Sequence, residues 1–144
     1  MTETEILLVE DNAADARLTA IALEDAQLKH KIVLVRDGSE ALEYFYPAGD
    51  KTPDMEVRLP KVVFLDLKMP KVNGNEVLAR LKQDERTRKI PVVMFTSSQE
   101  PRDIKECYAL GANSYIVKPV DFDEFSKVVS HMGHYWTLDN LTLD

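Results

Sequence analysis

Five short runs of apolar residues recur along the chain, and stretches of mixed apolar and polar residues separate them. The runs cover residues 6–9, 32–35, 62–65, 92–95 and 115–117. Four of them are continuously apolar rather than alternating, which is typical of strands in a parallel sheet covered on both faces. Pro91 stands at the start of the fourth run, where the missing N–H of proline is tolerated. The pattern predicts five buried parallel strands.

The stretches between and after these runs carry apolar residues at helical spacing, and each predicts an amphipathic helix. The residues at this spacing are Ala14, Leu18, Ile21 and Ala22; Ala41, Leu42 and Phe45; Val77, Leu78 and Leu81; Ile104, Cys107 and Tyr108, as the inner face of the fourth helix; and Phe122, Phe125, Val128, Val129 and Met132, as the face of the fifth.

Start and stop signals support three of these helices. Asp37 and Asp121 each precede a glutamate by three residues, which resembles a helix-starting cap. Pro101 fits the first turn of the fourth helix, and Gly111 fits its end. Five alternations of strand and helix predict an α/β fold, a three-layer doubly wound domain with right-handed crossovers.

We expect one domain over residues 1–133 and a short tail over 134–144, with no second domain. Residues 46–60 contain three prolines and are long for a helix–strand connection, so we predict a solvated surface insertion there. The tail contains Tyr135 and Trp136 and is apolar enough to dock on another surface. The residues alone do not decide whether Trp136 packs on its own domain or at an interface.

The charge, the cysteine content and the lengths of the apolar runs exclude several classes of protein. The chain has 18 basic and 25 acidic residues and a formal net charge of −7, which argues against nucleic acid or an anionic membrane as the main partner. The single cysteine, Cys107, favours a reducing compartment. No apolar run approaches the length of about 18 residues that a membrane span needs. The acidic N-terminus does not resemble a signal peptide, so we expect a cytoplasmic protein.

Polar and charged side chains that could form a functional site directly follow four of the predicted strands. Glu10 and Asp11 follow the first strand, Asp66 the third, Thr96 the fourth and Lys118 the fifth. If these four strands are neighbours, the side chains meet in one crevice, because open α/β sheets bind ligands beyond the carboxyl ends of their strands. Clustered carboxylates without nearby His or Cys favour Mg²⁺. With a lysine and a hydroxyl added, the set suits a phosphoryl group, which one carboxylate can attack.

Each of these residues has an ordinary explanation when it is taken singly. The acidic pair could complement the charge of a helix N-terminus, Thr96 could be a helix cap, and Lys118 could lie in a turn. What favours the phosphoryl site is their combination, each residue at the same end of a different strand.

Residues 65–74, with the sequence Leu-Asp-Leu-Lys-Met-Pro-Lys-Val-Asn-Gly, resemble the phosphoacceptor segment of response-regulator receiver domains. The resemblance covers about residues 5–133, and it implies a flavodoxin-like, CheY-like fold with strand order 2-1-3-4-5. The other segments that carry it are Glu10-Asp11 as the acidic pair, Thr96-Ser97 as the switch hydroxyl, and Gly111-Ala112, Tyr115 and Lys118-Pro119 as the C-terminal signature.

The resemblance also implies how the acidic residues act. Asp66 would accept a phosphoryl group from a phosphohistidine on a sensor histidine kinase. Asp11, Asp66 and the backbone carbonyl of Lys68 would ligate Mg²⁺, and Glu10 would reach the ion through water. The first acid is Glu rather than the family's Asp, which leaves the direct ligand Asp11 intact.

For the switch, the resemblance implies that Lys118 pairs with the phosphate and that its bond to Pro119 is cis, an isomer only about 0.5–1 kcal/mol less stable for an X–Pro bond. On phosphorylation, Thr96 would turn toward the phosphate and Tyr115 would rotate inward behind it, as a population shift between two surface arrangements.

Residues 108–121, the 46–60 loop and the aromatic tail resemble the small stand-alone receivers that partner phytochrome-type histidine kinases. Such receivers often form homodimers through the fourth and fifth helices and the last strand. By this resemblance the protein would be a two-component phosphoacceptor rather than an enzyme. It would form a homodimer with Tyr135 and Trp136 as possible interface residues and signal through protein contact.

Three alternatives stay open. A haloacid-dehalogenase-type Mg²⁺-dependent phosphatase also uses an aspartate nucleophile, but it needs a second Asp two residues later, where this chain has Lys68. A flavodoxin-like carrier needs a phosphate loop after the first strand, and residues 10–15 are too anionic for one. The third alternative is a receiver-shaped scaffold that carries no phosphate. It would have no need to keep mutually repelling acids together.

Overall fold

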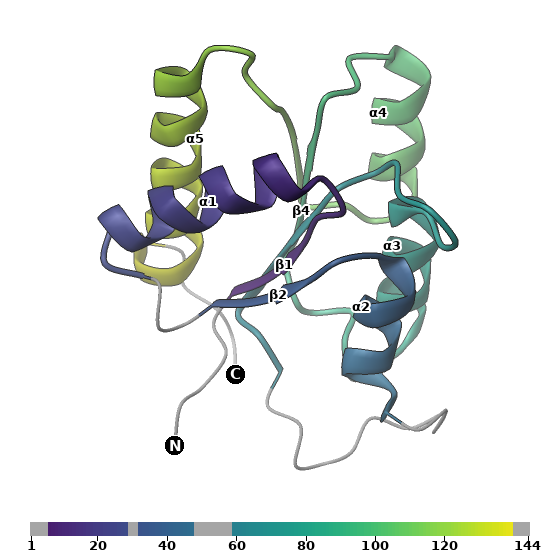
Figure 1. The fold of residues 1–144 in the computed structure, drawn as a ribbon. Helices are drawn as coiled ribbons and strands as arrows, with labels where there is room; N and C mark the ends of the chain where they lie inside the picture. The colour runs from purple at the N-terminus through teal and green to yellow at the C-terminus, as the bar shows by residue number, and fades with distance from the viewer. Residues whose placement is uncertain (1–5, 29–31, 48–58, 140–144) are drawn as a thin grey trace.

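Five parallel strands form the central sheet of this computed structural model, which describes residues 6–28, 32–47 and 59–139 (Figure 1). The order of the strands is β2-β1-β3-β4-β5, as predicted. Each predicted strand is present to within one residue at either end, because each is built on a short run of apolar residues. The strands are β1 (Ile6–Val9), β2 (Ile32–Val35), β3 (Val62–Leu65), β4 (Val92–Thr96) and β5 (Ser114–Val117).

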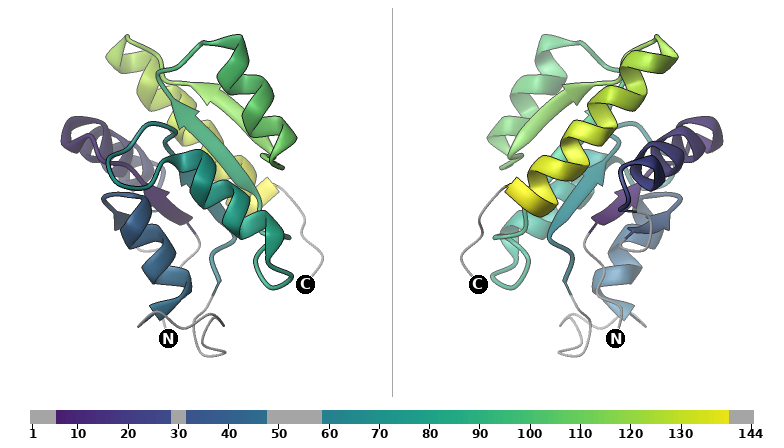
Figure 2. Two further views of the ribbon diagram at one scale, coloured as in Figure 1. Left: turned by 90° about the vertical axis from the view of Figure 1, so that its right-hand side faces the viewer. Right: turned by 90° about the vertical axis from the view of Figure 1, so that its left-hand side faces the viewer.

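Helices cover both faces of the sheet, as the two views in Figure 2 show. Helices α1 and α5 pack against each other on one face, while α2, α3 and α4 lie on the other. A π-helical segment, η3, continues α5 without a break. The helices are α1 (Ala13–Asp25), α2 (Gly38–Phe45), α3 (Gly74–Gln83), α4 (Pro101–Ala109) and α5 (Phe122–His134), followed by η3 (Tyr135–Asp139). No helix in the described ranges is both long and apolar enough to cross a membrane.

Two separate hydrophobic cores lie on the two faces of the sheet. Leu7 and Leu65 point toward α2, α3 and α4, whereas Leu8 and Phe64 point toward α1 and α5. This division follows from the two-residue period of a strand, which sends successive side chains to opposite faces. It also explains why β1 and β3 are apolar at every position, since both of their faces are buried.

Side-chain caps begin three helices. Asn12, Asp37 and Asp121 each accept a hydrogen bond from the backbone N–H three residues later, at 2.9, 2.9 and 3.0 Å. The helix starts predicted at Asp37 and Asp121 are therefore confirmed. Pro101 is the first residue of α4, and Gly111 follows its end with a φ of +108°, a left-handed conformation that favours glycine.

Three predicted helix faces need correction. In α1 the predicted set includes Ala14 and Ile21, which are exposed. In α4 Tyr108 is 49% exposed because its neighbour Cys107 occupies the core-facing position, about 100° away around the helix. Phe122 is 58% exposed at the first position of α5. The buried residues of α1 are Ala16, Thr19, Ala22 and Leu23.

The predicted insertion and tail are only partly described. Of residues 46–60, positions 48–58 lie outside the described residues, so the predicted surface insertion has no structural account. At its start, the buried Tyr46 donates a hydrogen bond to Asp84 at 2.7 Å. In the tail, Trp136 is partly buried against the core shared by α1 and α5, while Tyr135 is 51% exposed.

Candidate functional site

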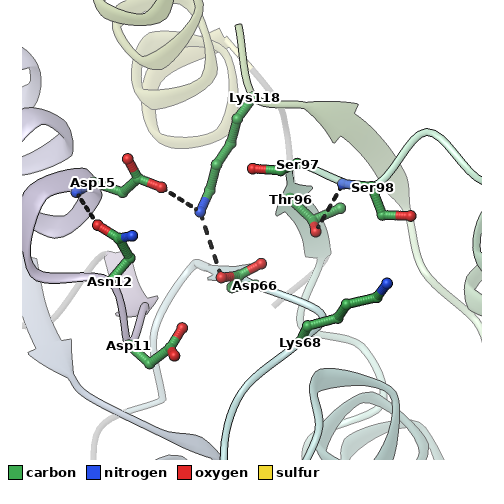
Figure 3. Close-up of a pocket in the computed structure, with 9 residues that line it drawn as sticks. All are labelled: Asp11, Asn12, Asp15, Asp66, Lys68, Thr96, Ser97, Ser98 and Lys118. Carbon is green, nitrogen blue, oxygen red and sulfur yellow. Dashed lines mark hydrogen bonds and ion pairs between the residues drawn. The ribbon is translucent and has the colours of Figure 1, made fainter. Parts of the chain in front are cut away.

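A polar pocket opens at the carboxyl ends of β1, β3, β4 and β5 (Figure 3). Strand register brings its residues together. Val9 of β1 pairs with Leu65 of β3, so the residues that follow them, Glu10 and Asp66, are adjacent. The Asp66 backbone N–H donates to the carbonyl of Val9 at 3.0 Å. The lining residues are Asp11, Asn12, Asp15, Asp66, Lys68, Thr96, Ser97, Ser98 and Lys118.

Three carboxylates meet at one side of this pocket. Glu10, Asp11 and Asp66 each offer an oxygen that lies within 4.8 Å of the others. Glu10 and Asp66 are buried, whereas Asp11 is exposed. Burial raises the pKa of Glu10 from its ordinary 4.5 to about 8, and the neighbouring Asp66 carboxylate adds to the effect. These hard oxygen donors fit a divalent cation such as Mg²⁺ or Mn²⁺.

Lys118 supplies the positive charge that faces the carboxylates. Its Nζ atom lies 2.7 Å from Glu10 Oε1, 2.9 Å from Asp15 Oδ2 and 3.4 Å from Asp66 Oδ2, and its side chain is only 5% exposed. Burial acts to lower the pKa of Lys118. The hydrogen bonds with Glu10 and Asp15 and the charge of Asp66 outweigh it and raise this pKa above its ordinary value. The ammonium therefore stays charged.

The fourth strand brings a hydroxyl group to the opposite side of Asp66. Thr96 is buried, and its Oγ1 accepts a hydrogen bond from the Ser98 N–H at 3.3 Å. Ser98 Oγ donates to Asp103 of α4 at 2.5 Å, and the Tyr115 hydroxyl donates to the Ser98 carbonyl at 3.0 Å. Thr96 and Tyr115, which the sequence suggested as paired switch residues, are thus connected through the same loop residue.

The loop after β3 fixes the orientation of Asp66. The Leu67 N–H donates to Asp66 Oδ1 at 2.8 Å, which leaves Oδ2 facing Lys118. At the start of α3, the Gly74 N–H donates to the Leu67 carbonyl at 2.7 Å. A Cβ atom on Gly74 would lie 2.1 Å from the Asp66 carbonyl oxygen, so only glycine allows this close approach.

Two features of the site differ from the sequence prediction. The bond between Lys118 and Pro119 is trans, because the described residues contain no cis peptide bond. This is the ordinary preference of an X–Pro bond. The sequence reasoning also gave no separate role to Asp15, an ion-pair partner of Lys118. The available signal was its position three residues after the capping Asn12, which places it in the first turn of the helix that borders the crevice.

Comparison with known proteins decides the family. A model of the response regulator receiver domain matches residues 6–130, nearly the whole chain. This chain belongs to the response regulator receiver family.

Two relatives illustrate the similarity. The "Probable methanogenesis regulatory protein FilR2" of Methanothrix harundinacea is 41% identical over 133 residues, covering 91% of this chain and 82% of the relative. "Response regulator Rcp1" of Synechocystis sp. is 35% identical over 138 residues, covering 96% of this chain and 91% of the relative. The receiver described here is therefore a two-component response regulator.

Solved structures agree with this family. The phosphorylated cyanobacterial phytochrome response regulator RcpA superposes with a TM-score of 0.87 and 35% identity, covering 99% of this chain and all of the other. A Mn²⁺-bound form of response regulator Rcp1 gives a TM-score of 0.84 and 32% identity, covering 98% of this chain and 99% of that one. The flavodoxin-like fold is confirmed, and nothing in these comparisons supports the haloacid-dehalogenase alternative.

Proposed function

We propose that this response regulator accepts a phosphoryl group on Asp66 from a sensor histidine kinase of the phytochrome type, with Mg²⁺ as its cofactor. The observation that carries the proposal is the environment of Asp66. Its Oδ1 accepts from the Leu67 N–H and its Oδ2 faces Lys118, with Asp11 on one side and the Thr96 hydroxyl on the other. This arrangement places positive charge and a hydrogen-bond donor around an oxygen nucleophile.

In the proposed transfer, a carboxylate oxygen of Asp66 attacks the phosphorus atom of a phosphohistidine. The P–N bond breaks, its electron pair stays on the histidine nitrogen, and Asp66 becomes an acyl phosphate. Asp11, Asp66 and the backbone carbonyl of Lys68 would hold Mg²⁺, and Glu10 would contact it through water. When bound, the ion supplies positive charge for the phosphoryl oxygens. Lys118 pairs with a further phosphoryl oxygen.

The same transfer would drive the switch. To donate to a phosphoryl oxygen, the Thr96 side chain turns toward the phosphate and gives up the hydrogen bond that it accepts from the Ser98 N–H at 3.3 Å. Tyr115 would then leave the Ser98 carbonyl, to which it now donates at 3.0 Å, and rotate behind Thr96. The loop that contains Ser98 and the start of α4 would rearrange, which changes the surface presented to a partner.

The protein acts in this proposal as a phosphoacceptor rather than as a phosphatase. Two residues after Asp66, where an enzyme of the dehalogenase type needs a general acid and base, the exposed Lys68 ammonium lies 3.9 Å from Asp103. A protonated lysine cannot accept a proton, so the chain would catalyse its own dephosphorylation poorly.

The proposed partners follow from the relatives. The similarity to RcpA and Rcp1 over nearly the whole chain supports a phytochrome-type kinase. The proposed location of the protein is the cytoplasm. A homodimer through α4, β5 and α5 is supported by the half-exposed Tyr108 of α4 and Tyr135 next to α5. Tyr135 makes an edge contact with Trp136, with 5.0 Å between ring centres, so the two aromatic residues would contribute to the interface together.

Phosphate labelling tests the central proposal. Wild-type protein with Mg²⁺ and acetyl phosphate, or with a phosphorylated phytochrome-type kinase, should gain one acid-labile phosphoryl group, detected by intact mass and by phosphate-affinity electrophoresis. Asp66→Asn should gain none, whereas Asp123→Asn, an exposed acid in the first turn of α5, should be labelled like the wild type. Labelling of Asp66→Asn, or none of the wild type by either donor, would contradict the proposal.

Sedimentation tests the proposed dimer. Tyr135→Ser should weaken self-association of the phosphorylated protein, whereas Ile21→Ser, which removes a 45% exposed residue from α1, should not. Equal association of the two variants and the wild type would exclude Tyr135 from the interface.

A further inference from the structure

Asp15 is fixed beside the phosphoacceptor pocket without belonging to its acidic cluster. Its backbone N–H donates to Asn12 Oδ1 at 2.9 Å, and its carbonyl accepts from the hydroxyl of the buried Thr19 at 2.7 Å. These two contacts hold the first turn of α1, and the Asp15 side chain extends from it toward Lys118 (Figure 3). The carboxylate oxygen Oδ2 lies 2.9 Å from Lys118 Nζ.

Lys118 has no free N–H donor in this state. An ammonium group has three N–H donors. The three carboxylates of Glu10, Asp15 and Asp66 lie within reach of them, at 2.7, 2.9 and 3.4 Å. The longest of the three distances is the one to the phosphoacceptor. To donate fully to a phosphoryl oxygen on Asp66, Lys118 must therefore weaken one of its other two contacts.

The burial of the two competing carboxylates decides which contact weakens. The Glu10 side chain is 1% exposed, so a Glu10 carboxyl group left without its ammonium partner would gain no water in exchange. The Asp15 side chain is 26% exposed and can be hydrated when Lys118 moves away. The negative charge that a phosphoryl group adds would also repel Asp15, which acts in the same direction.

We propose that Asp15 is a positioning residue that holds Lys118 back from the phosphoryl group and so favours the unphosphorylated form of the protein. The inference rests on the proposed function of Asp66 as phosphoacceptor. It goes beyond that function because it assigns a second role, on α1, to a carboxylate that competes with the phosphoryl group for Lys118. This competition would set how readily the pocket accepts a phosphoryl group. In this proposal Asp15 acts mainly through its contact with Lys118 and is neither a ligand of the ion nor a hydrogen-bond partner of the phosphoryl group.

The test is a titration of the full chain with beryllofluoride, a phosphoryl mimic, at a Mg²⁺ concentration that saturates each variant. Binding is followed by the amide signal of Thr96 in ¹⁵N-labelled protein. Asp15→Asn should lower the apparent Kd by about fivefold, the change expected when one charge-assisted contact no longer competes. Asp15→Glu, which restores the charge, should return the Kd toward that of the wild type.

Two further variants separate this role from a general effect of charge or folding. Glu124→Gln removes the same charge at the equivalent position of α5, three residues after its cap, and should leave the Kd unchanged. Asp15→Ser, which keeps a small polar residue in the first turn of α1, should lower the Kd as Asp15→Asn does.

The possible outcomes are distinguishable. If wild-type protein does not bind beryllofluoride, the proposed function fails, and the inference fails with it. If the wild type binds but Asp15→Asn and Asp15→Ser bind equally well or more weakly, the proposed function stands and the role of Asp15 is refuted. The role is also refuted if Asp15→Glu behaves like Asp15→Asn, or if Glu124→Gln gives the same gain.

Discussion

Replacing Glu10 with glutamine will change how the stability of the metal-free protein depends on pH. Glu10 is 1% exposed, and burial, with the adjacent Asp66 carboxylate, raises its pKa from 4.5 to about 8 despite the hydrogen bond with Lys118. Between these two pH values the folded protein keeps a proton on Glu10 that the unfolded chain has lost. Glutamine has almost the same shape as glutamate and cannot titrate. A comparison of the two proteins therefore measures the contribution of this one proton to stability.

The expected size of the effect follows from proton linkage. When the folded state binds one proton more than the unfolded state, the free energy of unfolding falls by about 1.4 kcal/mol for each unit of rising pH. The contribution of Glu10 is therefore present in full below pH 4.5 and is lost as the pH rises toward 8. From pH 5.5 to 7.5 the wild type should lose about 2–3 kcal/mol relative to Glu10→Gln.

Urea unfolding in EDTA at pH 5.5, 6.5 and 7.5 measures this difference. Carboxylates away from Glu10 are the same in both proteins, so their contributions cancel when the two free energies of unfolding are subtracted. Glu124→Gln is the matched control, because this glutamate is exposed in the first turn of α5, and its difference from the wild type should stay constant with pH. Mg²⁺ favours the ionised form of Glu10 and should make the wild-type slope shallower.

A difference between wild type and Glu10→Gln that does not change with pH would refute the reasoning. It would mean that Glu10 is ionised in the folded protein throughout this range, and that the ion pair with Lys118 outweighs burial.

Three further predictions concern other parts of the chain. Gly74→Ala places a Cβ atom 2.1 Å from the Asp66 carbonyl oxygen, so urea unfolding should show a loss of about 1–3 kcal/mol and acetyl phosphate labelling should fall. Gly133→Ala meets the flexible end of Leu23 at 2.7 Å while gaining helix propensity, so its net effect should stay within about 1 kcal/mol. The thiol of Cys107 is buried, and its pKa is raised to about 11 by burial, so an aromatic disulfide reagent at pH 8 should react only as the protein unfolds.

The strands were predictable because burial on both faces leaves a continuous apolar run, a pattern with few competing explanations. Helix faces were less predictable where two large apolar residues are neighbours along the chain. Cys107 and Tyr108 both suit the inner face of α4 by spacing, and only packing shows that Cys107 is buried while Tyr108 is exposed. Phe122 was assigned to the core because it stands at helical spacing from Phe125 and Val129, although it lies at the exposed start of α5.

The sequence predicted which residues form the candidate site but not all of the hydrogen bonds and ion pairs among them. A parallel sheet brings the carboxyl ends of its strands to one edge, so residues directly after the strands could be grouped from the sequence alone. The role of Asp15 depends on the direction of a side chain from a helix, and the bond from Tyr115 to Ser98 depends on the path of a loop. Neither leaves a periodic signal. The predicted cis bond before Pro119 came from resemblance alone, and it was wrong.

The ion pair between Asp15 and Lys118 joins residues 103 positions apart, across the first helix and the last strand. A nascent chain that has not yet emerged past Lys118 therefore contains Asp66, Glu10 and Asp15 but not the buried ammonium group that contacts all three. The acids would repel one another in such a fragment until the final strand docks. Competence to accept a phosphoryl group should thus appear only once β5 and Lys118 have joined the sheet, and fragments that stop before Lys118 should not be labelled.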